Sequence, residues 1–167
     1  MVLLDILEFP DSRLRNKAKP VENVDGKLVK LCDQMLNTMY QAPGIGLAAI
    51  QVNVSKRLLV LDTSENKDSP LILINPVIIE AEGEIESNEG CLSVPGFYEP
   101  VSRSSKILVD AINRDGEPFN MEAEDLLAVC IQHEMDHLEG KLFVDYLSAT
   151  KRQMIRKKLQ KLQKQRA

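Results

Sequence analysis

The chain has 167 residues, of which 44% are hydrophobic and 28% are charged. A chain of this length buries enough surface for one hydrophobic core, so a single catalytic domain is expected. No stretch approaches the roughly 20 apolar residues that a membrane-spanning helix needs, which predicts a soluble protein.

The N-terminal residues and the number of cysteines indicate the cellular compartment of the protein. The first ten residues carry Asp5 and Glu8 and no basic segment, so they do not resemble a targeting peptide. Three cysteines, Cys32, Cys91 and Cys130, are an odd number in such a chain, which argues against a disulfide framework. We therefore expect reduced thiols and a cytoplasmic protein.

The net charge of -4 hides an asymmetry. Residues 151–167 contain eight Lys/Arg and no Asp/Glu, which leaves 13 basic against 25 acidic side chains in residues 1–150. A polyanionic partner is therefore expected to meet the basic tail, because the acidic body would repel it.

The predicted elements begin with an extended segment and a short turn at residues 11–16. Residues 27–41 place Leu28, Leu31, Met35 and Met39 at helical spacing, and this helix must end before Pro43. From residue 47 to residue 124 the pattern changes to short β-type runs, among them 57–61, 71–74 and 107–109, separated by turn-forming residues. These runs predict mostly antiparallel strands.

Two further helices are predicted near the C-terminus. One runs from Asp125 to Glu139, with acidic residues at its start and Gly140 directly after its end. The other begins at about Ser148 and has Ile155, Leu159 and Leu162 on one stripe among basic residues. The order of helix, strands and two helices predicts an α+β fold: antiparallel sheets around a central helix, with a C-terminal helix.

The central helix contains the motif H-E-x-x-H, formed by His133, Glu134 and His137. Residues four apart on a helix share one face, so both imidazoles can reach one metal ion. Glu134 lies further round the helix and suits a base acting on water beside that ion. Since the chain has no other histidine, this spacing favours a catalytic metal site over two unrelated side chains.

Two imidazoles need a third ligand, for which Cys91, Cys130 and a carboxylate are candidates. Cys130 lies seven residues from His137, about 10 Å along a helix, which favours a buried apolar role beside the site. Cys32, among apolar neighbours, is interpreted in the same way. Cys91 follows a glycine in a loop-like segment that can approach a helix closely.

Three segments together resemble the signature motifs of the peptide deformylase family. They are residues 44–51 (GIGLAAIQ), 89–93 (EGCLS) and 132–140 (QHEMDHLEG), and the resemblance spans nearly the whole chain. It implies hydrolysis of the formyl group from the N-terminal formylmethionine of new polypeptides, with release of formate. It also implies Cys91, His133 and His137 as metal ligands and Glu134 as the catalytic acid/base.

The resemblance implies further site residues. Charge on the formyl oxygen would be met by the ion, the Gln51 side chain and the backbone N–H of Leu92. The glycine-rich segment would pair with the substrate backbone. An ion pair between Glu89 and Arg103 is expected to brace the loop of Cys91. The residues expected to bind substrate are Gly44, Ile45, Gly46, Glu89, Gly90, Leu126, Val129 and Cys130, of which the apolar ones could equally be ordinary core.

The resemblance implies Fe²⁺ as the ion, one per chain, for which Zn²⁺, Ni²⁺ or Co²⁺ can substitute. One thiolate and two imidazoles also suit Zn²⁺, so the residues alone do not choose the metal. The variable stretch after Pro95 leaves contacts beyond the methionine undefined.

Other interpretations stay open at this point. Residues 44–49 fit the dinucleotide pattern G-x-G-x-x-[GA], but they follow a helix and enter a strand, the reverse of what that pattern needs. A zinc endopeptidase would need a different third ligand, and a structural metal site would need a fourth protein ligand. A cysteine hydrolase would use Cys91 with His133.

The expected organisation is a catalytic region, residues 1–150, continued within the same domain by a basic helix, residues 151–167. The expected partners are formylmethionyl nascent peptides and the ribosome, reached through that helix. No membrane contact is expected, and the chain is predicted to be a monomer.

Overall fold

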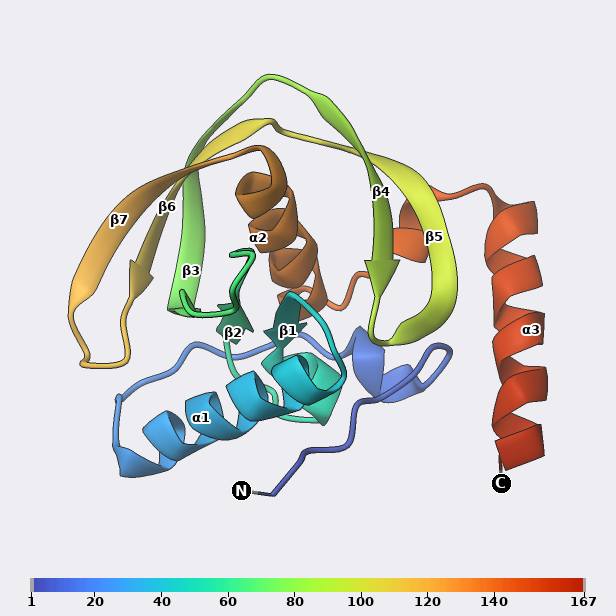
Figure 1. Ribbon diagram of the computed structural model, residues 1–167, viewed down its shortest axis with the longest axis horizontal. Coiled ribbons are helices and arrows are strands. Elements are labelled where there is room, and N and C mark those ends of the chain that lie inside the picture. The colour runs from blue at the N-terminus through green and yellow to red at the C-terminus, as the bar shows by residue number, and fades with distance from the viewer. Residues whose placement is uncertain (1, 167) are drawn as a thin grey trace.

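The structure of the protein is a computed structural model that describes residues 2–166. Along the chain, one helix is followed by the strands and then by two helices, which is the order that the predicted α+β fold requires (Figure 1). Three short 3₁₀ turns, η1 (Ser12–Arg15), η2 (Ala49–Val52) and η3 (Phe143–Tyr146), accompany the helices. The helices are α1 (Gly26–Gln41), α2 (Asp125–Leu138) and α3 (Ala149–Arg166), each within two residues of its predicted limits.

In the part of the chain that the structure describes, seven strands form two antiparallel sheets. The five-stranded sheet has the order β1-β2-β3-β6-β7, and the two-stranded sheet pairs β4 with β5. The strands are β1 (Gly46–Ala48), β2 (Leu58–Leu61), β3 (Leu71–Glu82), β4 (Ile85–Cys91), β5 (Val94–Arg103), β6 (Lys106–Ile112) and β7 (Pro118–Glu124). Figure 1 shows the connections β3–β4 and β5–β6 arching over one end of α2.

Strand β2 explains why helices cover both faces of the larger sheet. Successive side chains of a strand point to opposite faces. Leu58 and Val60 pack with α1, whereas Leu59 and Leu61 pack with α2, and all four are fully buried. A continuous apolar run is therefore what a central strand between two helices requires.

Strand β3 is longer than the predicted run at residues 71–74. Pro76 interrupts the apolar pattern, because proline cannot donate a ladder hydrogen bond. The chain accommodates it at an irregularity between Ile74 and Val77, where Asn75 has a positive φ of 52°. Pairing with β6 then resumes at Val77 and continues to Glu82.

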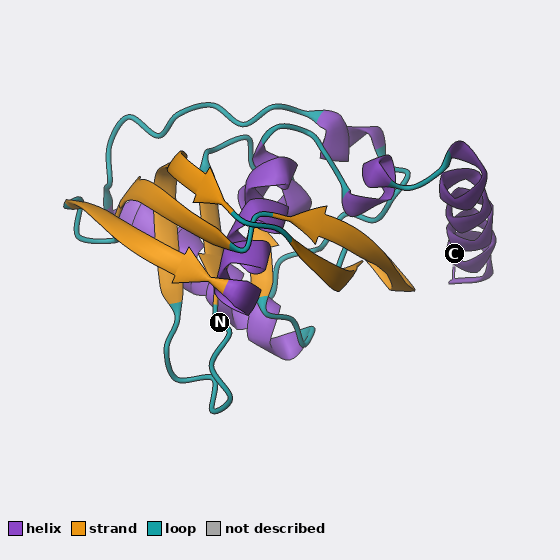
Figure 2. Ribbon diagram, turned by 90° about the horizontal axis from the view of Figure 1, so that it is seen from above, coloured by secondary structure: helices purple, strands orange, loops and turns teal. Residues whose placement is uncertain are grey.

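Helix α2 lies between the two sheets, as Figure 2 also shows from a second direction. Its C-terminus is closed by Gly140, whose φ of 77° is the left-handed conformation that a glycine adopts at lowest cost. A β-carbon there would lie 2.5 Å from the carbonyl oxygen of Arg15. This position therefore fixes where the chain leaves the helix.

Helix α3 packs on a separate apolar cluster with η3 and the N-terminal segment. Ile155 and Leu159 are fully buried there, as their predicted stripe implied, but Leu162 is 47% exposed. The stripe is therefore buried at Ile155 and Leu159, and its last residue, Leu162, lies on the surface. Within residues 2–166, none of the helices is both long and apolar enough to cross a membrane.

Candidate metal centre

The structure brings together Cys91 from the end of β4 and both histidines of α2. Cys91 Sγ lies 3.4 Å from His137 Nε2, which in turn lies 3.3 Å from His133 Nε2. In a tetrahedral site with metal–ligand bonds of about 2.0 to 2.3 Å, ligand atoms are separated by about 3.3 to 3.6 Å. The donor set and its spacing therefore fit one small divalent ion.

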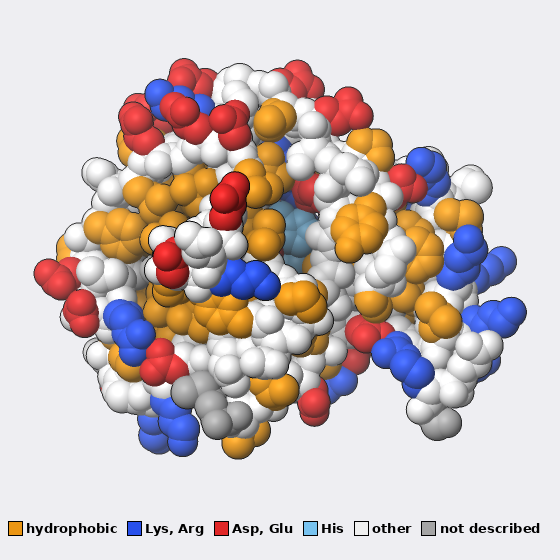
Figure 3. All heavy atoms as spheres, viewed as in Figure 1, with side chains coloured by type: hydrophobic (Ala, Val, Ile, Leu, Met, Phe, Trp, Pro, Cys, Tyr) orange, Lys and Arg blue, Asp and Glu red, His pale blue; other side chains and the backbone are white. Residues whose placement is uncertain are grey.

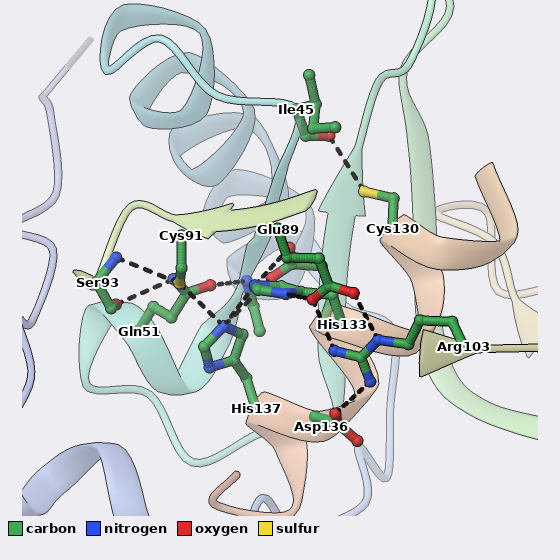
Figure 4. Close-up of polar contacts among 12 residues, drawn as sticks. Ile45, Gln51, Glu89, Cys91, Ser93, Arg103, Cys130, His133, Asp136 and His137 are labelled. Carbon is green, nitrogen blue, oxygen red and sulfur yellow. Dashed lines mark hydrogen bonds and ion pairs between the residues drawn. The ribbon is translucent and has the colours of Figure 1, made fainter. Parts of the chain in front are cut away.

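Strand β4 presents two side chains to α2. Glu89 and Cys91 both reach histidines of α2, although the pairing of β4 with β5 is irregular between these two residues. Glu89 Oε1 lies 2.8 Å from His133 Nδ1, while Cys91 approaches His137 (Figure 4). Because Glu89 occupies Nδ1 of His133, the other ring nitrogen faces the proposed ion.

The predicted ion pair between Glu89 and Arg103 is confirmed. Arg103 donates from Nε and Nη2 to the two oxygens of Glu89, at 2.7 and 2.8 Å, and both side chains are buried. Burial alone would raise the pKa of Glu89, but hydrogen bonds from Arg103 and His133 outweigh it and lower that pKa. Glu89 therefore stays ionised and holds the His133 ring.

Glu134 lies beside the three ligand atoms without contacting them directly. Its two oxygens are each 4.0 Å from a ligand nitrogen, Oε2 from His133 and Oε1 from His137. Burial raises the pKa of Glu134 to about 7. Among the described residues, Glu134 Oε1 and His137 Nδ1 are buried without a hydrogen-bond partner. A buried carboxylate oxygen without a partner is costly in a folded protein, so its presence here points to a role in chemistry.

The two imidazoles differ in electrostatic environment. Burial, followed by the charge of His133, lowers the pKa of His137 well below its usual value. For His133, burial acts in the same direction but is outweighed by Glu134, Cys91 and Glu89, which raise its pKa. The acidic groups around His133 therefore stabilise positive charge at that ring, whereas burial and neighbouring positive charges disfavour it at His137.

Gln51 is buried and held at both ends of its amide. Its Oε1 accepts from the backbone N–H of Ala48 at 2.9 Å. Its Nε2 donates to Ser93 Oγ at 3.0 Å and points at Cys91 Sγ, 3.5 Å away. The amide donor therefore faces the ligand group, and Leu92 lies in the turn directly after Cys91.

The predicted substrate-binding residues divide into two groups. Glycines 44, 46 and 90 lie where side chains have no room: β-carbons there would meet Leu92, Glu134 and the ring of Tyr98, respectively. Ile45 and Leu126 are about half exposed, whereas Val129 and Cys130 are buried in α2. Figure 3 shows histidine atoms at the bottom of an opening bordered by hydrophobic side chains.

Cys130 is separate from the ligand set, as predicted. It is 5% exposed, burial raises the pKa of its thiol well above the usual value, and its Sγ lies 3.8 Å from the carbonyl oxygen of Ile45. Cys32 is fully buried on the inner face of α1, and burial raises the pKa of its thiol to about 11. Both thiols therefore stay protonated and apolar in character.

Sequence reasoning missed several side chains around the centre. Asp136 accepts a hydrogen bond from Arg103, Tyr146 donates to Asp136, Phe143 stacks on His133, and Ser93 holds Gln51. Asp136 stands three residues after His133, and this helical spacing, which places it beside the ligand, was one available signal. The roles of Tyr146 and Phe143 had no local signal.

Comparison with known proteins agrees with this geometry. The family model described as polypeptide deformylase matches residues 3–153. A peptide deformylase from Teredinibacter turnerae is 62% identical over the whole of both chains, and one from Nitrosococcus oceani is 58% identical over 98% of each. The crystal structure of a peptide deformylase from Legionella pneumophila has a TM-score of 0.94 at 50% identity, covering 99% of this chain and 98% of that one. With a family model spanning most of its length and relatives this similar, the chain belongs to the polypeptide deformylase family.

Proposed function

We propose that Cys91, His133 and His137 hold the ion with which this deformylase removes the formyl group from the N-terminal formylmethionine of new polypeptides. The activity is that of the family, and formate is the second product. The observation that carries the residue assignment is the trio of ligand atoms, all within 4.8 Å of one another, beside a buried and unpartnered Glu134 oxygen.

Glu134 is the proposed acid/base. It takes a proton from the attacking water and later passes it to the amine that leaves the formyl carbon. A pKa of about 7, raised by burial, suits a group that must both accept and return a proton near neutral pH. When bound, the ion supplies Lewis-acid polarisation of the formyl oxygen and lowers the pKa of water.

Gln51 and the backbone N–H of Leu92 are proposed to stabilise negative charge on the formyl oxygen. Hydrogen bonds to Ala48 and Ser93 fix the Gln51 amide before substrate arrives, so little reorganisation is needed during the reaction. The Gln51 donor that faces Cys91 Sγ is the one placed for this role.

The substrate is proposed to lie along β1, which is one of the two edge strands of the larger sheet. A free edge can pair with an extended peptide, and missing side chains at Gly44 and Gly46 let it approach closely. Glu89 and Gly90 border the site from β4, with Glu89 acting through His133. The proposed methionine pocket is formed by the apolar residues Ile45, Leu126, Val129 and Cys130.

We propose Fe²⁺ as the ion, with Zn²⁺, Ni²⁺ or Co²⁺ able to replace it. Protein purified without oxygen should contain one iron per chain and release formate from a formyl-Met peptide. The iron form should lose activity in air as the ion or Cys91 is oxidised, and the nickel form should not. Equal air stability of the two forms would contradict an iron–thiolate site, and formate release that resists chelators would favour a cysteine hydrolase.

We also propose that α3 docks this monomeric enzyme to the ribosome, which places it in the cytoplasm. The helix exposes Arg156, Lys157, Lys158, Lys161 and Lys164, while Ile155 and Leu159 attach it to the body. Such a cationic surface is attracted to RNA phosphates. Gel filtration together with cell fractionation tests the monomer and the location.

A further inference from the structure

The turn η3 contacts the surroundings of His133 from two positions. At its first residue, the Phe143 ring lies 6.3 Å from the His133 ring, centroid to centroid, with 29° between the planes. At its last residue, Tyr146 reaches the polar groups behind α2. One short turn therefore contacts both the ring of a proposed metal ligand and the hydrogen-bond network that orients it.

Tyr146 begins an unbroken chain of short hydrogen bonds that ends at His133. Its hydroxyl donates to Asp136 Oδ2 at 2.7 Å, and Arg103 Nη1 donates to the same oxygen at 2.6 Å. The other two donors of Arg103 bind both oxygens of Glu89, which contacts His133 Nδ1 at 2.8 Å. Figure 4 shows Arg103 between Glu89 and Asp136.

The outer end of this chain borders water. A surface cavity of about 520 Å³ on the far side of α2 is lined by Arg103, Asp136 and Tyr146. The Arg103 side chain is nevertheless only 5% exposed, and its guanidinium lies 5.0 Å from the centre of the Tyr146 ring. Tyr146 therefore lies at the boundary between the solvent-filled cavity and a buried network whose hydrogen bonds water would weaken.

Tyr146 remains a donor throughout the neutral range. Partial burial, together with its hydrogen bond to Asp136, raises its pKa to about 12.

The turn η3, which carries Tyr146, is also fixed independently of the metal centre. Asp145 binds the backbone N–H of Leu142 and both ends of the Arg15 guanidinium, at 2.7 and 2.9 Å. These contacts of Asp145 hold the turn, and with it Tyr146, without using any residue of the hydrogen-bond chain to His133.

We propose that Tyr146 is a positioning residue for the metal centre: it holds Asp136 against Arg103, and thereby fixes Glu89 and the orientation of the His133 ring. The inference rests on the proposed role of His133 as a ligand. Groups that orient a metal-bound histidine typically change metal affinity about 10- to 100-fold when removed. Since Tyr146 acts through three intervening groups, we expect an effect near the lower end of this range.

The test uses the cobalt-loaded protein, whose visible absorption reports the ion and its thiolate ligand. Tyr146→Phe removes only the hydroxyl and keeps the ring over Arg103. We expect this variant to release Co²⁺ to an excess of chelator about tenfold faster than the unmodified protein. Failure of the unmodified protein to bind one Co²⁺ with thiolate absorption would overturn the ligand assignment itself.

Tyr40→Phe is the matched control. Tyr40 also donates a short hydrogen bond to an aspartate, 2.6 Å to Asp62, but that pair lies outside the network of His133. Both variants should lose comparable thermal stability, yet only Tyr146→Phe should speed the release of Co²⁺. An equal rate in Tyr146→Phe and the unmodified protein, or an equal acceleration in Tyr40→Phe, would overturn the inference.

The variant Asp136→Asn tests whether Tyr146 acts through Asp136. It weakens the link that Tyr146 is proposed to act through, so adding Tyr146→Phe to it should change the release rate little further. Independent, multiplying effects of the two substitutions would show that Tyr146 acts by another path and would overturn the proposal.

Discussion

Gly46 lies directly against the carboxylate of Glu134, although the two residues come from different elements, β1 and α2. A β-carbon at position 46 would lie 2.5 Å from Glu134 Oε2 and 3.0 Å from Cys130 Sγ. The position of the proposed catalytic carboxylate therefore depends on the absence of a side chain at residue 46.

Gly46→Ala should lower kcat about 10- to 100-fold while the metal content stays at one ion per chain. The added methyl group displaces Glu134, and a small displacement of a reacting group lowers the rate strongly, whereas the nearest atoms belong to Glu134 and Cys130 rather than to the three ligands. Steady-state kinetics and metal analysis measure the two effects. Gly26→Ala is the control, because a β-carbon there meets nothing within 4 Å. Unchanged kcat in Gly46→Ala would contradict the role of Glu134.

Glu134→Gln should bind metal normally and lose about 10²- to 10⁴-fold in kcat, because an amide cannot transfer the proton. Its thermal stability should be equal or higher, since folding no longer buries a carboxylate oxygen that lacks a partner. Formate release, metal analysis and calorimetry provide the measurements. Loss of the ion from this variant would show that Glu134 is a ligand instead.

The buried carboxylate of Asp62, which lies outside the metal centre, should make a pH-dependent contribution to the free energy of unfolding. Burial would raise its pKa, but hydrogen bonds from Ser64, Tyr40 and Ser69 outweigh burial and lower it. A lowered folded-state pKa means that the stabilisation is complete above the unfolded pKa of about 3.9 and is lost as the pH falls further. Asp62→Asn should thus cost about 1 to 3 kcal/mol at pH 7 and progressively less below pH 4.

Urea unfolding of both proteins across this pH range measures the difference. Asp110→Asn, at an exposed aspartate on β6, provides the control for a mere change of net charge. A difference between Asp62→Asn and the unmodified protein that grows on acidification would contradict the lowered pKa.

Ile155→Ala tests whether α3 belongs to the same domain as residues 1–150. Ile155 is fully buried in the cluster that includes Phe143, so its truncation should cost about 2 to 5 kcal/mol in a single unfolding transition. Leu162→Ala, at an exposed position of the same helix, should cost less than about 0.5 kcal/mol. A small effect at both positions, or a separate transition for the helix, would contradict a single domain.

Neutralising the exposed lysines of α3 tests ribosome docking more sharply than deleting the helix, because deletion would also uncover the apolar cluster beneath Ile155 and Leu159. The log-log slope of binding affinity against salt concentration should become shallower by about 0.7 to 0.9 for each RNA phosphate that the helix no longer neutralises. Hydrolysis of short formyl-Met peptides should be unchanged. The substitutions are Lys157→Gln, Lys158→Gln, Lys161→Gln and Lys164→Gln.

The control variant carries the same reduction of positive charge at exposed lysines elsewhere on the body. Co-sedimentation at several salt concentrations compares the two variants. If the α3 variant still sediments with ribosomes as the control does, docking belongs to another surface. The control substitutions are Lys17→Gln, Lys27→Gln, Lys30→Gln and Lys67→Gln.

The sequence by itself determined the features that depend on local periodicity. Helical spacing places His133 and His137 on one face of a helix wherever that helix lies, and the apolar runs predicted the strands around it. The limits of α2 and the α+β order followed from the same local preferences. Where a pattern was interrupted, as at Pro76, the prediction ended too early, because pairing with β6 compensates there for a locally unfavourable residue.

The tertiary structure decided which distant residues complete the centre. Cys91 meets the histidines because the β4–β5 hairpin lies beside α2, and no local preference encodes which strand faces which helix. The room for Glu134 at Gly46 and the link from Tyr146 to His133 likewise join segments far apart in the chain. These contacts arise when apolar faces pack, and packing selects partners by the complementarity of whole surfaces rather than by sequence distance.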